Sequence, residues 1–435
     1  MSSPEPFPDE SATVDAPSTH DNDTWPGWCT NVVIATPHYP GRGGTETVVA
    51  NLIPMFQSVG AEVQVISVYP SVGSAQPVTT TTTLFDRRAD LQTRSITGRR
   101  ISLGTLSRIP MLVAKRWDIV RSRRKLARIF SSLGAETLVI ATSARVAALL
   151  PTARSTDQRN RPIVVSQYHI PFEAQVEVEG VGLPVSRSID VDAFVALSNE
   201  DAQLFTAVLG TRCARLPNPA EAPRIPSETS DGRASSSTVV SLSRLSGEKQ
   251  IDRMIRSFVR ATDINGLRHW RLHIYGDGDE RSHLEEVIAQ TSGGGDRVRL
   301  MGWADQRDEV FDGASLLLST SRFESFGMNV LEAAQYATPT LAFACSPGII
   351  DLVTDLDGVL VAADDDAAFA VELRRLLSSP DHLGQLGERA RQHSEKYSTS
   401  SIVGEWGALI RRIREGREQF RPWWQASSHA QGIEP

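Results

Sequence analysis

Two series of strand-length apolar segments, each alternating with segments of helical character, restrict the fold of this chain more than any other feature. The first series comprises residues 31–40, 61–69, 136–142, 161–168 and 192–198. The second series comprises residues 238–245, 270–278, 297–303, 314–320, 339–345 and 358–363. Strands that alternate with helices form a parallel sheet covered on both faces. The sequence therefore predicts an α/β protein with two doubly wound, Rossmann-like domains.

The segment between the two series, residues 218–238, is rich in Pro, Ser and Glu, which is typical of a linker. A chain of 435 residues is also long for a single hydrophobic core. The acidic start of the chain is rich in Pro, Ser and Thr, as disordered tails are. We therefore predict a tail over 1–28, an N-terminal domain over 29–219, a linker over 220–237, a C-terminal domain over 238–402, and a helix within 403–435 that packs back on the N-terminal domain.

Composition indicates a cytoplasmic protein, either unattached or bound at the inner face of a membrane. The chain has no run of eighteen apolar residues, and its start lacks the basic and apolar parts of a signal peptide. Its three scattered cysteines favour neither disulfides nor a zinc site, and no other metal-binding cluster is visible. We therefore expect no bound metal.

Charge is distributed unevenly along the chain. Residues 87–128 hold thirteen Lys or Arg and two acidic residues, although the whole chain has a net charge of −7. This basic segment predicts peripheral contact with an anionic membrane or with a phosphate-bearing acceptor. The alternative is a solvated helical face of arginines. Nucleic acid is not expected as a partner, because no recognition motif accompanies the charge.

The segment 319–343 places one glutamate, Glu324, before a predicted helix and a second, Glu332, within it. We expect this helix to begin between Ser325 and Gly327, where its free N–H groups form an anion site. A rise of roughly 1.5 Å per residue separates Ser325 from Glu332 by about 10 Å. Because Glu332 lies off the apolar stripe of the helix, it could face a ligand. The alternative is a pair of solvated glutamates beside an ordinary helix.

Two cations follow the first strand of the second series. Arg244 comes at the end of this strand, and Lys249 precedes a helix, so both lie on one loop at the carboxyl edge of the sheet. Arginine and lysine at such an edge can bind phosphate. A glycine-rich loop, 41–46, precedes the first helix of the chain in a similar way. The alternatives are an exposed basic loop and a flexible glycine loop.

The order of these motifs resembles the retaining glycosyltransferases of family 4, which have the two-domain GT-B fold. The segments "SRLSGEK", "LHIYGDGDERSHLEEV" and "STSRFESFGMNVLEAAQYATPTLAF" are similar to the donor-binding half of that family. The segments "TPHYPGRGGTETVVANL" and "VVSQYHIPFE" resemble its N-terminal half, so the resemblance covers about residues 31–420. "SRLSGEKQIDRMI" and "CSPGII" look closest to members that glycosylate teichoic acid or related polymers.

The resemblance implies a role for each matching residue. Arg244 and Lys249 would bind the donor diphosphate, and Glu324 would contact the donor sugar at the reaction centre, beside His169. Glu332 would hold the ribose hydroxyls. Gly43 and Gly44 would lie under the diphosphate or the acceptor. The rest of the donor-binding set comprises Ser325, Phe326, Gly327, Met328 and Asn329.

The implied reaction moves a hexosyl group from a UDP- or GDP-linked sugar to a hydroxyl of a lipid, polymer or glycan, with retention at the anomeric carbon and without a metal or cofactor. Two other classes stay open: a catalytically silent GT-B partner protein, and a nucleotide-sugar epimerase. The family often has "GR" where this chain has "SR", and a glycine-rich acidic loop where it has "CSPGIIDLV". The second region partly sets which sugar is accepted, so the identity of the donor stays open. The sequence does not determine the base, the acceptor or the oligomeric state either.

Overall fold

The structure is a computed structural model that describes residues 25–41, 43–70, 77–85, 121–122, 124–150, 160–179, 191–209, 213–220 and 237–418. Most of the predicted tail, the linker and the basic segment, and the chain after Glu418, lie outside the described residues. Within these ranges no helix combines the length and the apolar character needed to cross a membrane.

The described N-terminal residues form one parallel sheet in the order β3-β2-β1-β4-β5-β6-β7. Its strands are β1 (Asn31–His38), β2 (Glu62–Tyr69), β3 (Thr80–Thr83), β4 (Thr137–Ala141), β5 (Ile163–Gln167), β6 (Ala193–Ala196) and β7 (Cys213–Arg215). Its labelled helices are α1 (Gly44–Ser58), α3 (Ala144–Ala147), α4 (Phe172–Glu179) and α6 (Asn199–Leu209). Apolar side chains of the sheet are buried on both faces, as the apolar runs predict.

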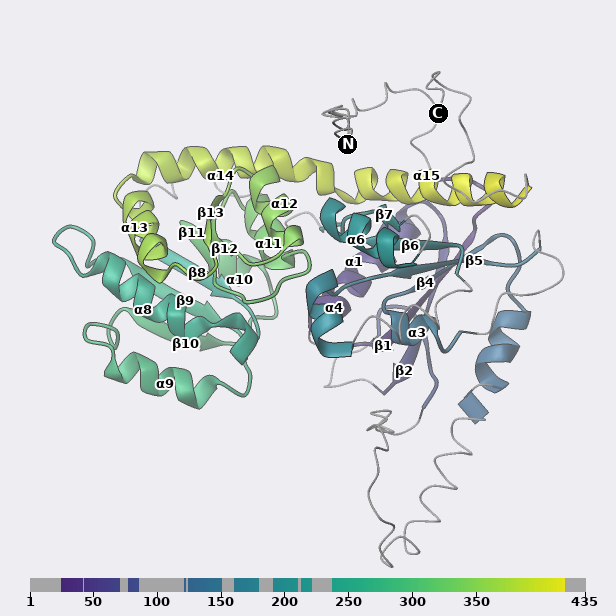
Figure 1. Cartoon of the computed structure of the whole chain (residues 1–435), viewed down its shortest axis with the longest axis horizontal. Helices are drawn as coiled ribbons and strands as arrows, with labels where there is room; N and C mark the ends of the chain where they lie inside the picture. The colour runs from purple at the N-terminus through teal and green to yellow at the C-terminus, as the bar shows by residue number, and fades with distance from the viewer. Residues whose placement is uncertain are drawn as a thin grey trace, which may run out of the picture.

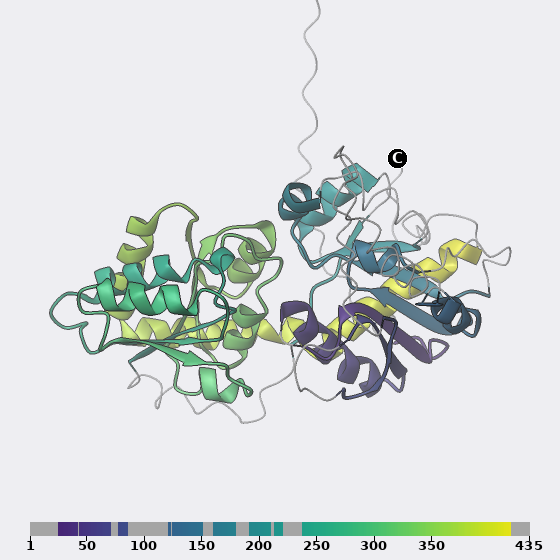
Figure 2. The same cartoon turned by 90° about the horizontal axis from the view of Figure 1, so that it is seen from below.

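The described C-terminal residues form a second parallel sheet in the order β10-β9-β8-β11-β12-β13. Its strands are β8 (Thr238–Leu242), β9 (Arg271–Tyr275), β10 (Val298–Gly302), β11 (Leu316–Ser319), β12 (Thr340–Ala344) and β13 (Val359–Ala362). The helices are α8 (Ile251–Thr262), α9 (Arg281–Gln290), α10 (Asp308–Phe311), α11 (Met328–Gln335), α12 (Pro347–Asp355), α13 (Asp366–Leu377) and α14 (Pro380–Ser394), with 3₁₀ turns η2 (Gly247–Lys249) and η3 (Glu395–Tyr397). The prediction of two doubly wound α/β domains is confirmed (Figures 1 and 2).

The last described helix, α15 (Thr399–Glu418), returns to the N-terminal domain (Figure 1). Its Trp406 is fully buried and meets the ring of Phe56 on α1 edge-on, with the centroids 5.9 Å apart. Such packing of large aromatic surfaces stabilises the contact between the helix and the domain.

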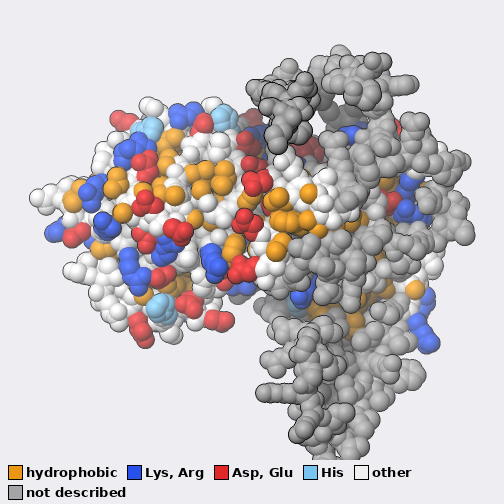
Figure 3. Space-filling model, in the orientation of Figure 1, with side chains coloured by type: hydrophobic (Ala, Val, Ile, Leu, Met, Phe, Trp, Pro, Cys, Tyr) orange, Lys and Arg blue, Asp and Glu red, His pale blue; other side chains and the backbone are white. Residues whose placement is uncertain are grey.

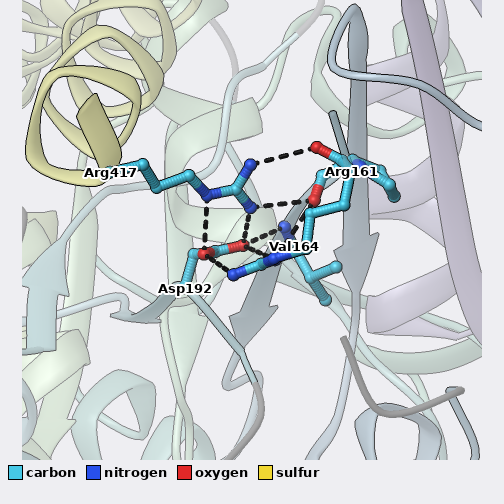
Figure 4. A network of polar contacts seen from close by, with 5 residues as sticks. Arg161, Val164, Asp192 and Arg417 are labelled. Atoms are coloured by element: carbon cyan, nitrogen blue, oxygen red, sulfur yellow. Dashed lines mark hydrogen bonds and ion pairs between the residues drawn. The ribbon is translucent and has the colours of Figure 1, made fainter. Parts of the chain in front are cut away.

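The far end of α15 is held by a buried polar network (Figure 4). The Asp192 carboxylate accepts hydrogen bonds from the guanidinium of Arg161 at 2.7 Å and from Nε of Arg417 at 3.0 Å. Arg417 also donates to the carbonyl oxygen of Pro162 at 2.9 Å, and the Val164 N–H donates to Asp192 at 2.8 Å. All of these groups are largely buried, so losing one partner would leave an unbalanced charge inside the protein.

Candidate functional site

The two strands that carry the predicted phosphate-binding residues are neighbours at the centre of the C-terminal sheet. β8 pairs with β9 on one side and with β11 on the other, so the chain reverses its direction of winding between β8 and β11. Ligands of open α/β sheets bind outside the carboxyl ends of strands at such a switch point. Arg244 and Lys249 follow β8, and Glu324 follows β11, so all three lie at this position.

The loop that presents Arg244 is tied to the loop after β9. The N–H groups of Ser243 and Leu245 donate to the carbonyl oxygens of Tyr275 and Asp277, at 3.1 and 3.0 Å. A Cβ built on Gly276 would lie 1.8 Å from a Ser243 oxygen, and Gly276 also has a positive φ of 131°. Only glycine fits there. The Arg244 side chain is thus exposed on a loop with a firmly held backbone.

Gly278 supports the same loop, since its Cβ would lie 2.3 Å from the Leu245 carbonyl oxygen. The sequence interpretation assigned no role to Gly276 or Gly278. The signal that could have found them is the "GDG" triplet directly after a strand, because glycines in such a position mark a close approach of two backbones.

Lys249 and Glu324 form an ion pair across the switch point. Nζ of Lys249 donates to Oε2 of Glu324 at 2.6 Å, and the two side chains are only 19% and 18% exposed. The backbone of Lys249 is held by the residue that follows β11, because the Thr320 hydroxyl donates to the Lys249 carbonyl oxygen at 3.1 Å. A cation and a carboxylate so placed could bind an anionic and a hydroxyl group of one ligand side by side.

The loop between β11 and α11 is shaped by the residues that follow β12. The Ser346 hydroxyl donates to the Glu324 carbonyl oxygen, and a Cβ on Gly348 would lie 1.9 Å from the Ser325 carbonyl oxygen. α12 therefore packs directly against this loop. The sequence interpretation did not assign positioning roles to Ser346 or Gly348.

The helix after this loop begins at Met328, slightly later than expected, with Gly327 as its N-cap at a φ of 90°. The distance between the carboxylates is therefore not set by continuous helical rise from Ser325. The Phe326 side chain is buried and meets Tyr397 edge-on, with centroids 5.8 Å apart. Asn329 donates to the Leu242 carbonyl oxygen at 3.0 Å, which joins α11 to the end of β8.

Glu332 lies in a more enclosed position than its place in the helix suggested. The residue is 8% exposed, and its Oε2 lies 2.8 Å from Nε of Arg307. Nε of Arg307 forms no hydrogen bond with any described residue, so this contact is an ion pair only. Burial raises the pKa of Glu332, and the Arg307 charge opposes that rise. The ribose-binding role of Glu332 stays a prediction.

The predicted N-terminal site residues lie on the facing domain. Gly43 is the N-cap of α1, and a Cβ built on it would lie 3.3 Å from Nη2 of Arg244. The glycine loop and the phosphate-binding candidate Arg244 are therefore close together across the domain boundary. Among the described residues, no atom would lie within 4 Å of a Cβ on Gly44, so no described side chain covers the start of α1 there. On the face shown in Figure 3, acidic and hydrophobic side chains gather along this boundary.

His169 follows β5, and its ring nitrogen Nε2 is shielded from water. The residue as a whole is half-buried, but its Nε2 is buried and has no hydrogen-bond partner among the described residues. This burial lowers the pKa of His169 from 6.5 to about 4, so the ring is neutral at neutral pH. No hydrogen bond or ion pair between described residues joins it to Arg244, Lys249 or Glu324, and its place at the reaction centre stays a prediction.

The comparison with protein families bears on the domain that contains these cations. Residues 230–393 match the family model described as glycosyl transferases group 1. That range includes Arg244, Lys249, Glu324 and Glu332, and it supports a glycosyltransferase. Among the described residues, no cluster of three or more His, Cys, Asp or Glu side chains could hold a metal ion.

Two relatives from bacteria are similar over different shares of the chain. An exopolysaccharide phosphotransferase of Streptomyces coelicolor is 28% identical over 320 residues, 71% of this chain and 32% of that protein. The poly(ribitol-phosphate) alpha-N-acetylglucosaminyltransferase of Staphylococcus aureus is 27% identical over 167 residues, 38% of this chain and 33% of that protein. The matches therefore span about a third of the length of each relative.

Solved structures share the arrangement of both domains. The structure of Anabaena Alr3699/HepE in complex with UDP matches with a TM-score of 0.62 at 16% identity, over 87% of this chain and 98% of that one. The predicted GT-B fold, with two Rossmann-like domains, is confirmed.

Proposed function

We propose that this protein is a retaining hexosyltransferase that uses a nucleotide-diphosphate sugar as donor. The observation that carries the proposal is the meeting of Arg244, Lys249 and Glu324 at the β8/β11 switch point, opposite the glycine loop of the other domain. Two cations beside the amino end of α11 suit a diphosphate, and a carboxylate beside them suits the hydroxyls of its sugar.

The chemical task of this site is to stabilise negative charge on the leaving diphosphate as the bond to the sugar breaks. Arg244 and Lys249 supply two positive charges, and the N–H groups at the start of α11 add the positive end of its dipole. We include metal independence in the proposal, because these groups can supply the charge that a divalent ion would supply. No other cofactor is needed for such a transfer.

We propose UDP as the nucleotide and a hydroxyl-bearing envelope polymer or glycan as the acceptor. Support for UDP comes from the Anabaena structure of the same fold, which is a complex with UDP. Support for a polymer comes from the names of the two bacterial relatives, one an exopolysaccharide enzyme and the other a poly(ribitol-phosphate) enzyme. The "alpha" in the second name agrees with retention of an α-linked donor.

Attachment to the inner face of a membrane is a separate part of the proposal. It depends on the basic segment 87–128, of which only residues 121–122 and 124–128 are described. Binding to vesicles of anionic lipid that weakens with salt would support this part, and equal binding to neutral vesicles would contradict it.

The proposal is tested by incubating the protein with UDP-glucose, UDP-N-acetylglucosamine and GDP-mannose, each with and without poly(ribitol phosphate) or an exopolysaccharide. Mass spectrometry of the products is expected to show a free nucleoside diphosphate and a glycosylated acceptor. An isomerised sugar nucleotide would instead show an epimerase. The absence of turnover with every donor would favour a silent partner protein and contradict the proposal.

A second candidate is transfer of a sugar phosphate, which is favoured by the name of the Streptomyces relative. The two reactions break different bonds of the same donor. Transfer of the sugar alone breaks the bond between the anomeric carbon and oxygen and releases UDP. Transfer of the sugar phosphate breaks the pyrophosphate and releases UMP. The identity of the released nucleotide therefore separates the two candidates in a single assay.

A further inference from the structure

The first turn of α1 holds a carboxylate, Glu46, whose position is set by the glycine loop in front of it. A Cβ on Gly41 would lie 2.9 Å from Cγ of Glu46, and a Cβ on Gly43 would lie 2.4 Å from its Oε2. Any side chain at Gly43 would therefore displace the carboxylate. The glycines leave the room in which Glu46 folds back over the loop.

The same glycine is also close to the phosphate-binding candidate of the other domain. The Cβ position of Gly43 is 3.3 Å from Nη2 of Arg244. Glu46 and Arg244 thus approach one point from the two domains, but they do not come close enough to form an ion pair. Within the described ranges, neither side chain forms a hydrogen bond or an ion pair with another residue.

A carboxylate in this position is unsuited to contact a diphosphate, because like charges at short range repel each other. It is suited to accept a hydrogen bond from a neutral hydroxyl, and none of the described residues fills the space beside Gly44. We propose that Glu46 binds an acceptor hydroxyl beside the donor diphosphate. This inference rests on the proposed function, and it places Gly43 and Gly44 on the acceptor side of the site.

The simpler role for Glu46 is to stabilise the amino end of α1 through the helix dipole. That role predicts a less stable protein when the charge is removed, with no effect on ligands. The acceptor role predicts two opposite effects. Without its charge the residue would repel the diphosphate less, so that UDP binds more tightly. It would also hold the acceptor less well, so that the acceptor KM rises.

Glu46→Gln keeps the size of the side chain and removes its charge, and Glu62→Gln is the matched control. Glu62 is exposed at the start of β2, at the edge of the sheet away from the glycine loop. In Glu46→Gln we expect the Kd for UDP, measured by calorimetry at low salt, to fall about threefold to tenfold, and this gain to shrink at high salt. We expect the acceptor KM to rise about tenfold or more. Glu62→Gln is expected to match the wild type in both measurements.

An unchanged or weaker affinity of Glu46→Gln for UDP would overturn the inference, as would an unchanged acceptor KM. The Kd for UDP is measured without an acceptor, so this test can be made before the acceptor is identified. A wild-type protein that binds neither UDP nor GDP would contradict the proposed function itself, and the inference would fall with it. A lower Tm with unchanged UDP affinity would leave Glu46 with only its helix-stabilising role.

Discussion

Replacing Lys249 tests the diphosphate site at its best-defined contact. Lys249→Met keeps most of the side-chain volume, removes the ammonium group and leaves Glu324, which is 18% exposed, without its partner at 2.6 Å. An ammonium and a phosphate about 4–5 Å apart attract each other by roughly 3–4 kcal/mol at an effective dielectric constant of about 20. Since Lys249 must first leave Glu324, its net contribution to UDP affinity is smaller, about 1–2 kcal/mol, or about tenfold in Kd.

The effect on turnover is expected to be larger than the effect on binding. Negative charge grows on the leaving diphosphate only as the bond breaks, and loss of one such stabilising group costs about a hundredfold to a thousandfold in kcat. The assay is UDP release under saturating donor, together with calorimetry of UDP. Lys396→Met is the control, because its partly exposed ammonium pairs with Asp355 and not with Glu324.

A double-mutant cycle that combines Lys249→Met with Glu324→Gln measures the coupling between these two side chains. Because Glu324 competes with the diphosphate for Lys249, Glu324→Gln alone is expected to leave UDP affinity unchanged or to improve it, while turnover falls. Values of kcat and Kd for Lys249→Met within threefold of the wild type would refute the assignment of Lys249 to the diphosphate.

Four further predictions follow from particular contacts. Gly348→Ala would bring a Cβ to 1.9 Å from the Ser325 carbonyl oxygen in the β11–α11 loop, so kcat/KM should fall at least tenfold. The control Gly384→Ala, at an exposed position of α14, should stabilise the protein by about 0.5–1 kcal/mol. Arg417→Met removes one of the two arginines that pair with the buried Asp192 carboxylate. It should lower the free energy of unfolding, measured in urea, by about 2–3 kcal/mol, and it should leave turnover per folded molecule unchanged. Burial lowers the pKa of His169 from 6.5 to about 4 in the folded protein, so the unfolded chain binds an extra proton between these pH values. The free energy of unfolding should therefore fall as the pH falls from 6.5 towards 4, and this fall should be smaller in His169→Gln. Glu332→Gln should raise the donor KM with little change in kcat.

Each of these predictions has a result that would contradict it. Normal kcat/KM in Gly348→Ala would mean that the loop conformation does not matter for turnover. A loss of turnover in folded Arg417→Met would place α15 in the reaction and not only in the scaffold. Identical pH profiles for the wild type and His169→Gln would show that this ring is not held neutral by burial. A pure loss of kcat in Glu332→Gln would speak against a ribose contact.

Much of the fold could be predicted because its signal is local. Buried parallel strands appear as continuous apolar runs, and the clustering of Arg244, Lys249 and Glu324 follows from their places after strands β8 and β11. β3 was missed because its sequence is four threonines at the sheet edge, without an apolar run. The alternation of strands and helices thus predicts which edge holds the site.

The contacts that refine the site could not be predicted, because they depend on which loops meet in space. Glu332 lies off the apolar stripe of α11, yet the loop before α10 brings Arg307 to it and closes that face as well. The tight approach of Gly276 to the Arg244 loop likewise joins segments that are distant in the sequence. A sequence pattern can mark a glycine where two backbones approach, as the "GDG" triplet does, but it does not say which segment the glycine meets.

The most direct test of the account is a crystal structure of the protein with UDP bound. We expect the β-phosphate oxygens to lie within hydrogen-bonding distance of Arg244, of Lys249 and of the backbone N–H groups at the start of α11. We also expect Lys249 to be drawn away from Glu324. A diphosphate bound elsewhere, with the Lys249–Glu324 pair intact, would contradict the account.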